Sequence, residues 1–576
     1  MSAVEQFLRA RDFLLSAKSY QEAKAGFDWP QPSRFNWALD YFDTLAERCT
    51  NPALIHVDDS GASRSVTFQA LKERSAKVAN LFRSMGLTAG NRIMLMMGNR
   101  MELFESFLGA MKAACVIVPA STLLTSEDIG DRIVRGKIRC IVADKEFSEK
   151  VDNGASLSGT PVSKVSIGGA PQGWVDYAEA DSHSSAFRTE QDRNLHDELI
   201  TYFTSGTTAK PKLVSHTCGS YPIGHLTTMY WIGLRRGDRH YNISAPGWAK
   251  HAWSTIFSPW NAEATSFVYN YAGRFDHEKV LKLIEEYEIS TLCAPPTVWR
   301  FLLLEDVRKY SFSLKEMVSA GEPLNPEIIQ KVKSATGLTI REGYGQTETS
   351  LQIGIFPGMN VKLGSMGVEA PGFNMNVLNE RNHPAPQDTE GSIAIRVKPE
   401  RPVGLMAGYI DPPGRNAEVF VGDWYLTGDV AYRDKDGYFW FVGRSDDVFK
   451  SSDYRISPFE VESELMVHPA VAEVAVVASP DPMRGFVPKA FLMLKPGTVP
   501  SRDLALGIFR FTREKIAPYR RPRILQFMVE LPKTISGKIR RAELRRQESE
   551  LRKRKVTADN EYFETDFSEE FGMQRR

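Results

Sequence analysis

Cysteine is scarce in this sequence, and the few cysteines are not paired. The 576 residues contain five, namely Cys49, Cys115, Cys140, Cys218 and Cys293, and none of them stands in a Cys-x-x-Cys pair. An odd number of scattered cysteines argues against a disulfide framework and a cysteine zinc site, and favours reduced thiols in the cytoplasm. Each is better explained as a small core residue than as a nucleophile.

Net charge and long apolar runs are lacking as well. Lys and Arg number 72 against 71 Asp and Glu, which gives a formal net charge of +1. This balance supplies no global field to recruit nucleic acid or a membrane surface. No run reaches the roughly 18 apolar residues of a membrane helix, and residues 1–16 lack the apolar core of a secretory signal. We therefore predict a cytoplasmic protein without membrane insertion and without a nucleic-acid partner; a homodimer stays open.

What the sequence does have is the composition of a large globular protein, with 42% hydrophobic and 25% charged residues. Its length allows two or more domains. Residues 1–50 have the pattern of an amphipathic helical lead-in. Beyond them, short apolar strands such as 93–97 and 115–119 alternate with helical stretches such as the one that opens at Thr67–Phe68. This alternation predicts parallel α/β layers.

The pattern changes after Gly391, where alternating strands are separated by Gly and Asp turns. The polar run 443–447 is the predicted domain boundary. The last residues are rich in charge and poor in apolar side chains, which is typical of solvated helix faces or frayed tails. The predicted fold is α/β, with a large N-terminal domain of layered α/β subdomains and a β-rich subdomain (1–443), a hinge (444–446), a small mobile α+β C-terminal domain (447–545) and a charged tail (546–576).

A loop rich in hydroxyl groups follows a predicted strand at residues 199–203. Its hydroxyls, backbone N–H groups and cations suit the oxygens of a triphosphate. It is not a Walker A loop, because Pro211 stands where that motif requires its second glycine. Taken alone, the loop fits an ordinary polar turn equally well. Its candidate phosphate contacts are Thr204, Ser205, Gly206, Thr207, Thr208, Lys210 and Lys212.

Four further stretches offer groups for the same ligand. In residues 341–349, Tyr344 could stack on a base and Glu348 could hold Mg²⁺ through oxygen. Asp429 offers a carboxylate for ribose hydroxyls, and Arg444 lies shortly after it. Glycine in the run 319–324 allows a close backbone approach, and Lys538 ends a turn at 532–538. Each stretch also has an ordinary explanation as a turn, a core tyrosine or a surface ion pair.

Together and in this order, these stretches resemble the adenylate-forming superfamily of acyl-CoA synthetases, adenylation domains and luciferases. The resemblance runs from about Thr67 to Lys538. Within the superfamily the chain is most similar to medium-chain acyl-CoA synthetases, on the lead-in and residues 245–248, 319–324 and 479–485. The resemblance implies an ATP-dependent acid–CoA ligase of fatty acid metabolism. A carboxylate attacks the α-phosphate of Mg·ATP, which gives acyl-AMP and pyrophosphate, and coenzyme A then displaces AMP.

The resemblance also implies roles for single residues. Thr347 meets the α-phosphate, Glu348 binds the metal, and Lys538 bridges the carboxylate and the α-phosphate. Asp429 and Arg444 hold the ribose, and the 204–212 loop holds the β- and γ-phosphates. Besides that loop, the implied ATP-binding residues are Gly321, Glu322, Pro323, Glu342, Gly343, Tyr344, Gly345, Gln346, Thr347, Asp429, Arg444 and Arg455.

The small domain of the superfamily rotates between the two half-reactions, about a hinge residue that matches Asp446. Rotation withdraws Lys538, and Arg455 replaces it as the cation that faces phosphate. In the rotating loop, Asp453 stands where the family has glycine. Its carboxylate adds bulk and negative charge near a thiol that must become a thiolate, so we hypothesise a weakened or redirected thioester step. The implied CoA contacts are Ser452, Asp453, Tyr454, Arg484, Arg521 and Arg523.

The acid-binding site is the part that the sequence defines least. Trp248, Tyr221 and Trp253 suggest aromatic walls, which ordinary core packing explains equally well. A medium-chain, branched or aryl acid is expected. Two alternatives remain: an enzyme that loads the acyl group onto a carrier protein, which Asp453 favours, and a non-catalytic nucleotide-binding protein. The presence of Lys538 and Glu348 argues against the second.

Overall fold

The computed structural model describes residues 1–189, 193–204, 210–271, 273, 275–452, 454–534 and 537–572. The chain divides into two compact units. Unit 1 comprises Met1–Met375, Ile395–Tyr425 and Gly437–Phe439, and unit 2 comprises Asn376–Ala394, Leu426–Asp436 and Trp440–Arg576. All five cysteines are free thiols, four of them buried. The domain boundary placed at 443–447 from the sequence stays a prediction.

Unit 1 begins with the helical lead-in expected for residues 1–50. Ser2 caps the first helix with a reciprocal capping box to Glu5. Arg11 is buried on this helix, where Glu263 pairs with its guanidinium at 2.8 Å. The ion pair therefore ties the lead-in to a distant part of unit 1. The segments are α1 (Ala3–Ser16), α2 (Tyr20–Gly26), η1 (Trp37–Phe42) and α3 (Asp43–Ala46).

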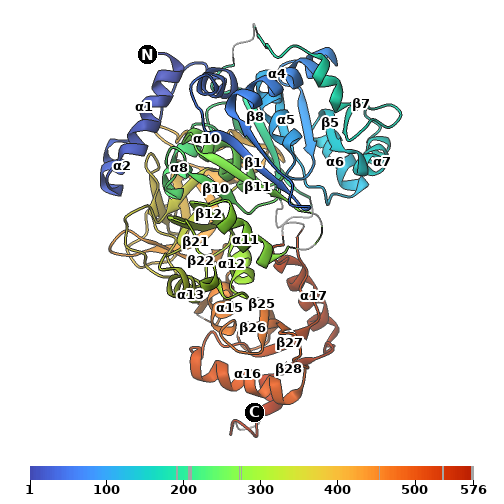
Figure 1. Cartoon of the computed structure of the whole chain (residues 1–576). Helices are drawn as coiled ribbons and strands as arrows, with labels where there is room; N and C mark the ends of the chain where they lie inside the picture. The colour runs from blue at the N-terminus through green and yellow to red at the C-terminus, as the bar shows by residue number, and fades with distance from the viewer. Residues whose placement is uncertain are drawn as a thin grey trace. The chain divides into compact units, whose positions relative to one another are not determined.

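An eight-stranded sheet in unit 1 contains the predicted parallel layer. Its order is β19-β9-β8-β4-β3-β5-β6-β7, parallel from β8 to β7 and antiparallel at β8–β9 and β9–β19. Helices α4 to α7 of this part run from blue to cyan in Figure 1, and Thr67 caps α4 as expected. The strands are β3 (Arg92–Met96), β4 (Val116–Pro119), β5 (Ile138–Asp144), β6 (Ser163–Ile167), β7 (Val175–Asp176), β8 (Glu198–Thr204), β9 (Lys212–Thr217) and β19 (Gly408–Asp411), and the helices are α4 (Phe68–Ser84), α5 (Met101–Lys112), α6 (Ser126–Arg135), α7 (Ser148–Ser158), η2 (Lys145–Phe147) and η3 (Tyr177–Ser182).

A nine-stranded sheet forms the second layer of unit 1, in the order β16-β15-β14-β13-β12-β10-β11-β1-β2. Its central pairs from β1 to β14 are parallel, and β2, β15 and β16 are antiparallel edges. The strands are β1 (Pro52–Asp58), β2 (Ser63–Thr67), β10 (Arg239–Asn242), β11 (Thr265–Asn270), β12 (Thr291–Ala294), β13 (Glu316–Ala320), β14 (Arg341–Gly345), β15 (Leu351–Gly354) and β16 (Val368–Glu369), and the helices are α8 (His225–Ile232), α9 (Ala249–His251), η4 (Ala252–Phe257), α10 (Ser258–Asn261), α11 (His277–Glu286), α12 (Pro296–Leu302), η5 (Val307–Lys309) and α13 (Pro326–Thr336).

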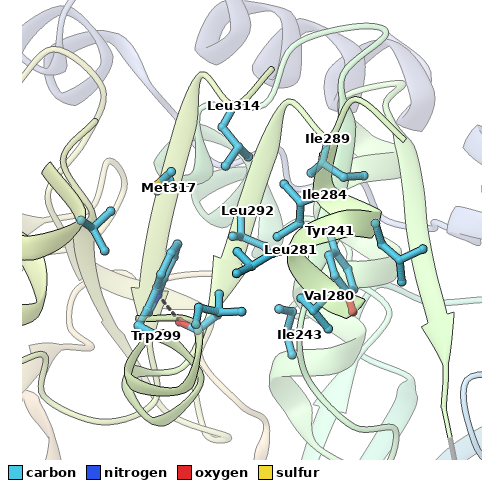
Figure 2. Close-up of a cluster of buried hydrophobic side chains, with 14 of the residues drawn as sticks. Tyr241, Ile243, Val280, Leu281, Ile284, Ile289, Leu292, Trp299, Leu314 and Met317 are labelled. Carbon is cyan, nitrogen blue, oxygen red and sulfur yellow. Dashed lines mark hydrogen bonds between the residues drawn. The ribbon is translucent and has the colours of Figure 1, made fainter. Parts of the chain in front are cut away.

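A hydrophobic core packs against this second sheet (Figure 2). Leu281 and Ile284 of α11 lie against Leu292 of β12 in one buried cluster. Trp299 of α12 packs in the same cluster, and its indole N–H donates to the carbonyl of Ala294 at 3.1 Å. Buried indole N–H groups need such a partner. The core fixes the helices against the strands whose ends bear the candidate site.

A third group of strands is divided between the two units. Phe420–Val421 pairs antiparallel with the start of the next strand, at Trp424 and Tyr425. The predicted hairpin at 429–443 is present as the end of β21 and β22. The elements are β17 (Met375–Leu378), β18 (Gly391–Arg396), α14 (Arg415–Val419), β20 (Phe420–Val421), β21 (Trp424–Arg433) and β22 (Phe439–Arg444).

Unit 2 contains a four-stranded sheet, β25-β26-β27-β28, with the α+β character predicted for it. Its core of buried aliphatic and aromatic residues includes Val461, Leu492 and Phe509. These elements run from orange to red in Figure 1. They are β23 (Phe449–Ser451), β24 (Tyr454–Ile456), α15 (Pro458–Leu465), β25 (Val471–Asp481), β26 (Gly485–Leu494), α16 (Arg502–Lys515), β27 (Ile524–Met528), α17 (Arg541–Arg554), β28 (Glu561–Phe563) and η6 (Glu564–Phe567).

The segment 546–576, expected as a charged tail of solvated faces or frayed ends, is folded into unit 2 over its described residues. Strand β28 pairs antiparallel with β27, and Phe567 is completely buried in the core. Glu548 and Glu561 are also completely buried, where both contact the ammonium group of Lys489. The carboxylates are tolerated inside because they are paired. Charge content alone therefore misplaced this segment.

Candidate active site

Two parallel strands bring two of the predicted stretches to one edge of the nine-stranded sheet. Strands β13 and β14 are neighbours, with Ala320 opposite Gly343. The chain leaves β13 through Gly321, whose φ of +105° favours glycine. It leaves β14 into residues 346–348. Because the carboxyl ends of parallel strands share an edge, this is the position where α/β sheets bind ligands.

Glycine at 343 is required by close packing. A side-chain carbon there would come within 2.4 Å of the indole ring of Trp231. The neighbouring Glu342 is 5% exposed, and its Oε1 accepts a hydrogen bond from the backbone N–H of Leu324 at 3.3 Å. Burial raises the pKa of Glu342 to about 8, despite that hydrogen bond. Burial therefore favours the protonated, neutral form of the Glu342 carboxyl.

The predicted phosphate loop joins β8 to β9. Thr204 and Lys212 face each other at the ends of the two antiparallel strands. Residues 205–209, and with them Ser205, Gly206, Thr207 and Thr208, lie outside the described residues. Lys210 is 74% exposed, with its ammonium group 3.6 Å from a carboxylate oxygen of Asp131.

Glu348 is linked to the end of this loop by a tyrosine that the sequence analysis did not identify. The hydroxyl of Tyr409 donates to Oε1 of Glu348 at 2.7 Å. The ammonium group of Lys212 lies 5.6 Å from the centre of the same tyrosine ring, within the range of a cation–π contact. The structure thus brings together the candidate metal ligand and a candidate phosphate ligand from different sheets of unit 1.

The other predicted residues of this edge are also placed. Glu322 accepts a hydrogen bond from the hydroxyl of Thr297 at 3.1 Å. Tyr344, Gly345, Gln346 and Thr347 are half-buried, and Pro323 stands beside Glu322 in the same turn. The backbone N–H of Gln346 binds the hydroxyl of Thr349 at 3.0 Å, which shapes the turn around Thr347.

The predicted ribose-binding pair lies in unit 2. Arg444 contacts the buried carboxylate of Asp429 at 3.2 Å and that of Asp446, the predicted hinge residue, at 3.5 Å. The backbone N–H of Ser445 donates to the carbonyl of Gly428 at 3.0 Å. One guanidinium therefore connects the predicted ribose carboxylate to the predicted hinge.

Lys538 stands on the tight turn that was predicted for it. Its backbone carbonyl accepts from the N–H of Thr534 at 2.7 Å, and Gly537 has a φ of +81°. The side chain of Lys538 is exposed. A lysine on such a turn is held by its backbone while its ammonium group projects into solvent.

The predicted CoA contacts are spread over unit 2. Tyr454 is 53% exposed and stacks on Tyr519 at 4.5 Å, and Arg455 and Arg484 are exposed. Ser452 has a φ of +54°, and its N–H binds the carbonyl of Arg484 at 2.9 Å. Asp453 lies outside the described residues.

Arg521 and Arg523 are already engaged inside unit 2. Arg521 donates to the carbonyls of Ile516 and Arg513, both at 2.7 Å. Arg523 pairs with Glu564 and donates to the carbonyl of Pro518 at 2.8 Å. Of the basic residues named for CoA from the sequence, Arg484 is the most open to a ligand phosphate.

Two of the three predicted acid-site aromatics belong to one buried cluster. Tyr221 is completely buried and packs edge-on against His225 at 4.5 Å. Trp253 stacks parallel to His225 at 6.0 Å, and among the described residues its indole N–H has no hydrogen-bond partner. Trp248 is half-buried and precedes α9.

Two family models match the chain. Residues 42–410 match the family described as AMP-binding enzyme, and residues 460–538 match the AMP-binding enzyme C-terminal domain. The first match alone covers more than half of the 576 residues. This chain belongs to the AMP-binding enzyme family.

Named relatives of this family member cover almost the whole chain. Acyl-coenzyme A synthetase ACSM3, mitochondrial, of Rattus norvegicus is 41% identical over 542 residues, which are 92% of this chain and 93% of the relative. The 4-hydroxybutyrate–CoA ligase 1 of Metallosphaera sedula is 42% identical over 534 residues, with 92% and 93% covered. The predicted resemblance to acyl-CoA synthetases is therefore confirmed.

A solved structure agrees with this placement in the AMP-binding enzyme family. The anthranilate CoA ligase AuaEII in complex with anthranoyl-AMP superposes with a TM-score of 0.81 and 28% identity, over 90% of this chain and 98% of that chain. The predicted α/β fold, with a large and a small domain, is confirmed by this likeness and by the two family matches.

Two absences concern only the part of the chain that the structure describes. None of its helices has the length and apolar character needed to cross a bilayer. It also contains no cluster of three or more His, Cys, Asp and Glu side chains able to hold a metal ion by themselves. Glu348, the residue named for Mg²⁺ from the sequence, offers carboxylate oxygens of the kind that this ion binds together with waters and substrate phosphates.

Two residues of this AMP-binding enzyme were missed from the sequence. Tyr409 contacts Glu348 across 61 residues, and His216 contacts Thr347 across 131 residues. Neither stands in one of the glycine-rich stretches. The available signal was the strand after the loop, where a histidine follows Lys212 by four positions in the run Leu213-Val214-Ser215-His216-Thr217.

Proposed function

We propose that this chain is an AMP-forming acid–CoA ligase, which activates a medium-chain, branched or aryl carboxylic acid through an acyl-adenylate. The observation that carries the proposal is the contact of Tyr409 with both Glu348 and Lys212, because it places a carboxylate for a metal beside a cation for phosphate. The relatives at about 40% identity include an acyl-coenzyme A synthetase and a CoA ligase.

In the first half-reaction, a carboxylate oxygen of the acid attacks the α-phosphorus of ATP. The bond from that phosphorus to the bridging oxygen breaks, and pyrophosphate leaves with the electron pair. Little covalent chemistry is asked of the protein, since positioning and charge neutralisation dominate phosphoryl-type transfer. Lys210, Lys212 and the 204–208 hydroxyls would hold the β- and γ-phosphates, and Thr347 the α-phosphate.

Lys538 would neutralise the charge that builds up between the incoming carboxylate and the α-phosphate. Its exposed position on a backbone-held turn suits that role. Asp429 and Arg444 would hold the ribose, with Asp446 as the hinge. Mg²⁺ bound through Glu348 would supply further neutralisation of phosphate charge.

In the second half-reaction, the thiolate sulfur of coenzyme A attacks the acyl carbon, and the bond from that carbon to the AMP oxygen breaks. The proposed contacts of this step are Ser452, Tyr454, Arg455, Arg484, Arg521 and Arg523. Asp453 is proposed to weaken it or to change the acceptor, and a carrier protein is the corresponding second candidate. We propose that the chain works in the cytoplasm, whereas its ACSM3 relative of Rattus norvegicus is named as a mitochondrial protein.

We propose the substrate class from the acids named for the relatives and from the aromatic side chains of the candidate acid site. The named activities of the relatives concern 4-hydroxybutyrate and anthranilate, a short hydroxy acid and an aryl acid. The buried aromatic cluster of Tyr221 and Trp253 is a suitable wall for an acyl chain or ring. An acid panel should therefore include straight chains of four to ten carbons, hydroxy acids and aryl acids.

The proposal is tested by acid-dependent pyrophosphate release, followed by mass spectrometry of the products with and without coenzyme A. Acyl-AMP without coenzyme A, and an acyl-CoA thioester with it, are expected. Acyl-AMP that never yields a thioester would support carrier loading. No acid-dependent release across the whole panel, in protein that binds ATP, would support the non-catalytic alternative.

A further inference from the structure

A buried histidine connects strand β9 to the turn that bears Thr347 and Glu348. His216 is completely buried, and its Nε2 lies 2.7 Å from the backbone carbonyl oxygen of Thr347. Its Nδ1 lies 3.0 Å from the hydroxyl oxygen of Ser220. Both ring nitrogens therefore have a partner inside unit 1.

The hydrogen-bond partners determine which ring nitrogen carries the proton. A carbonyl oxygen only accepts, so Nε2 must be the protonated nitrogen that donates to Thr347. The Ser220 oxygen accepts the backbone N–H of Thr217 at 2.8 Å, which leaves its own hydroxyl hydrogen for Nδ1. The chain of donors runs from Thr217 through Ser220 and His216 to Thr347. A single neutral tautomer satisfies all of these groups.

The ring itself is held in place. The Tyr221 ring packs against His216 with centroids 4.7 Å apart. Burial lowers the pKa of His216 to about 4, so the neutral form is kept at assay pH. The positive charge of Arg401 also lowers the pKa of His216.

The far side of the same turn is fixed independently. The carbonyl of Glu348 accepts the backbone N–H of Met406 at 2.8 Å, and its carboxylate accepts the hydroxyl of Tyr409. Thr347 is thus held from β9, and Glu348 from the 406–409 segment that pairs with β9. Loss of the histidine would release the restraint on the Thr347 side of the turn.

We infer that His216 is a positioning residue for adenylate formation, which holds the carbonyl of Thr347 so that the Thr347 hydroxyl and the Glu348 carboxylate are presented in one arrangement. This inference rests on the proposed function, because Thr347 and Glu348 are the proposed α-phosphate and metal contacts. His216 itself contacts neither phosphate nor metal in this proposal. It acts through the backbone of Thr347, which is the proposed contact of the α-phosphate.

The test compares His216→Leu with His216→Gln. Leucine fills space without a donor, and the amide nitrogen of glutamine can restore the donor to Thr347. His216→Leu loses the hydrogen bond that positions the carbonyl of Thr347. This loss is expected to lower kcat of acid-dependent pyrophosphate formation about 10- to 100-fold. The KM for the acid is expected to stay within about threefold, and His216→Gln is expected to recover most of kcat.

His240 supplies the matched control. It is also a buried neutral histidine with both ring nitrogens bonded, to the hydroxyls of Thr291 at 2.7 Å and Ser254 at 3.0 Å. It does not bond to the 347–348 turn. His240→Leu is expected to lower thermal stability as His216→Leu does, and to leave kcat of the folded protein unchanged. Equal loss of kcat in both leucine variants would reduce His216 to a structural role and overturn the inference.

The outcomes separate the inference from the proposed function. Thr347→Ala and Glu348→Gln test the proposed site directly. If they lose activity while folded His216→Leu keeps the wild-type kcat, the inference is wrong and the proposed function stands. If the wild-type protein releases no pyrophosphate with any acid, the proposed function fails and the inference fails with it.

Discussion

The hydroxyl of Tyr409 lies 2.7 Å from Oε1 of Glu348, and the ring of the same tyrosine lies beneath the ammonium group of Lys212. One side chain thus contacts the proposed metal ligand and the proposed phosphate cation. Partners of metal ligands orient those ligands, and their loss typically costs about 10- to 100-fold in metal affinity or activity.

Tyr409→Phe should therefore raise the Mg²⁺ concentration needed for half-maximal activity, by about 10-fold. The ring that packs under Lys212 is retained, so the KM for ATP at saturating Mg²⁺ should change much less. The measurement is a magnesium titration of acid-dependent pyrophosphate release. Tyr438→Phe is the control, because the hydroxyl of Tyr438 donates to a backbone carbonyl, that of Asn360, at 2.8 Å. Equal magnesium curves for wild type and Tyr409→Phe would contradict the role of this contact.

Lys538→Ala should lower kcat of adenylate formation by about 100- to 1,000-fold, the typical loss of a group that stabilises developing charge. The same hairpin offers Lys533→Ala as a control, since the ammonium group of Lys533 pairs with Glu473 at 2.8 Å. Single-turnover assays of acyl-AMP formation check both variants. Similar rates for the two alanine variants would remove Lys538 from the catalytic step.

The raised pKa of Glu342 predicts a pH dependence of stability. The folded carboxyl keeps its proton up to about pH 8, whereas the unfolded one releases it near its ordinary pKa of 4.5. Between these values the unfolded state has lost a proton that the folded state retains, so the free energy of unfolding falls as pH rises, by an amount on the order of a few kcal/mol.

Glu342→Gln removes that proton exchange and should be increasingly stable relative to wild type from pH 5 to pH 8. Urea unfolding at four pH values measures the difference. Glu327→Gln is the control, because Glu327 is a half-exposed carboxylate paired with Lys331 at 2.7 Å. A constant stability difference across this range would show that Glu342 is already ionised in the folded protein.

Glu548→Ala should destabilise unit 2 by about 3–5 kcal/mol, because it leaves the buried ammonium group of Lys489 with one carboxylate fewer. Lys489 and Glu548 are completely buried and 2.6 Å apart. Glu550→Ala, which alters an exposed pair with Lys553, should change stability by less than about 1 kcal/mol. Chemical unfolding of both variants measures their free energies of unfolding. Equal losses in the two variants would contradict the role of the buried network.

The local patterns of the sequence predicted the fold well. Alternating strands and helices gave the parallel layers, Thr67 was recognised as the start of α4, and the glycine-rich stretches lie at strand ends such as Ala320 and Gly345. These features depend on neighbours within a few positions, where propensity and capping act.

The contacts that hold the candidate site were not predictable in the same way. His216 and Thr347 are 131 residues apart, and their contact depends on the packing of two different sheets. The described part of segment 546–576 was expected as a solvated tail, but its Glu548 and Glu561 pair with Lys489 inside unit 2, and charge content reports nothing about pairing. Residue spacing along one segment cannot show either relationship.

The most direct test of the account is the product of the reaction, measured by mass spectrometry with ATP, Mg²⁺ and the acid panel, first without and then with coenzyme A. The account predicts acid-dependent acyl-AMP and pyrophosphate in the first case, and an acyl-CoA thioester in the second, each lost in Lys538→Ala. Folded protein that binds ATP and forms neither acyl-AMP nor thioester with any acid would contradict it.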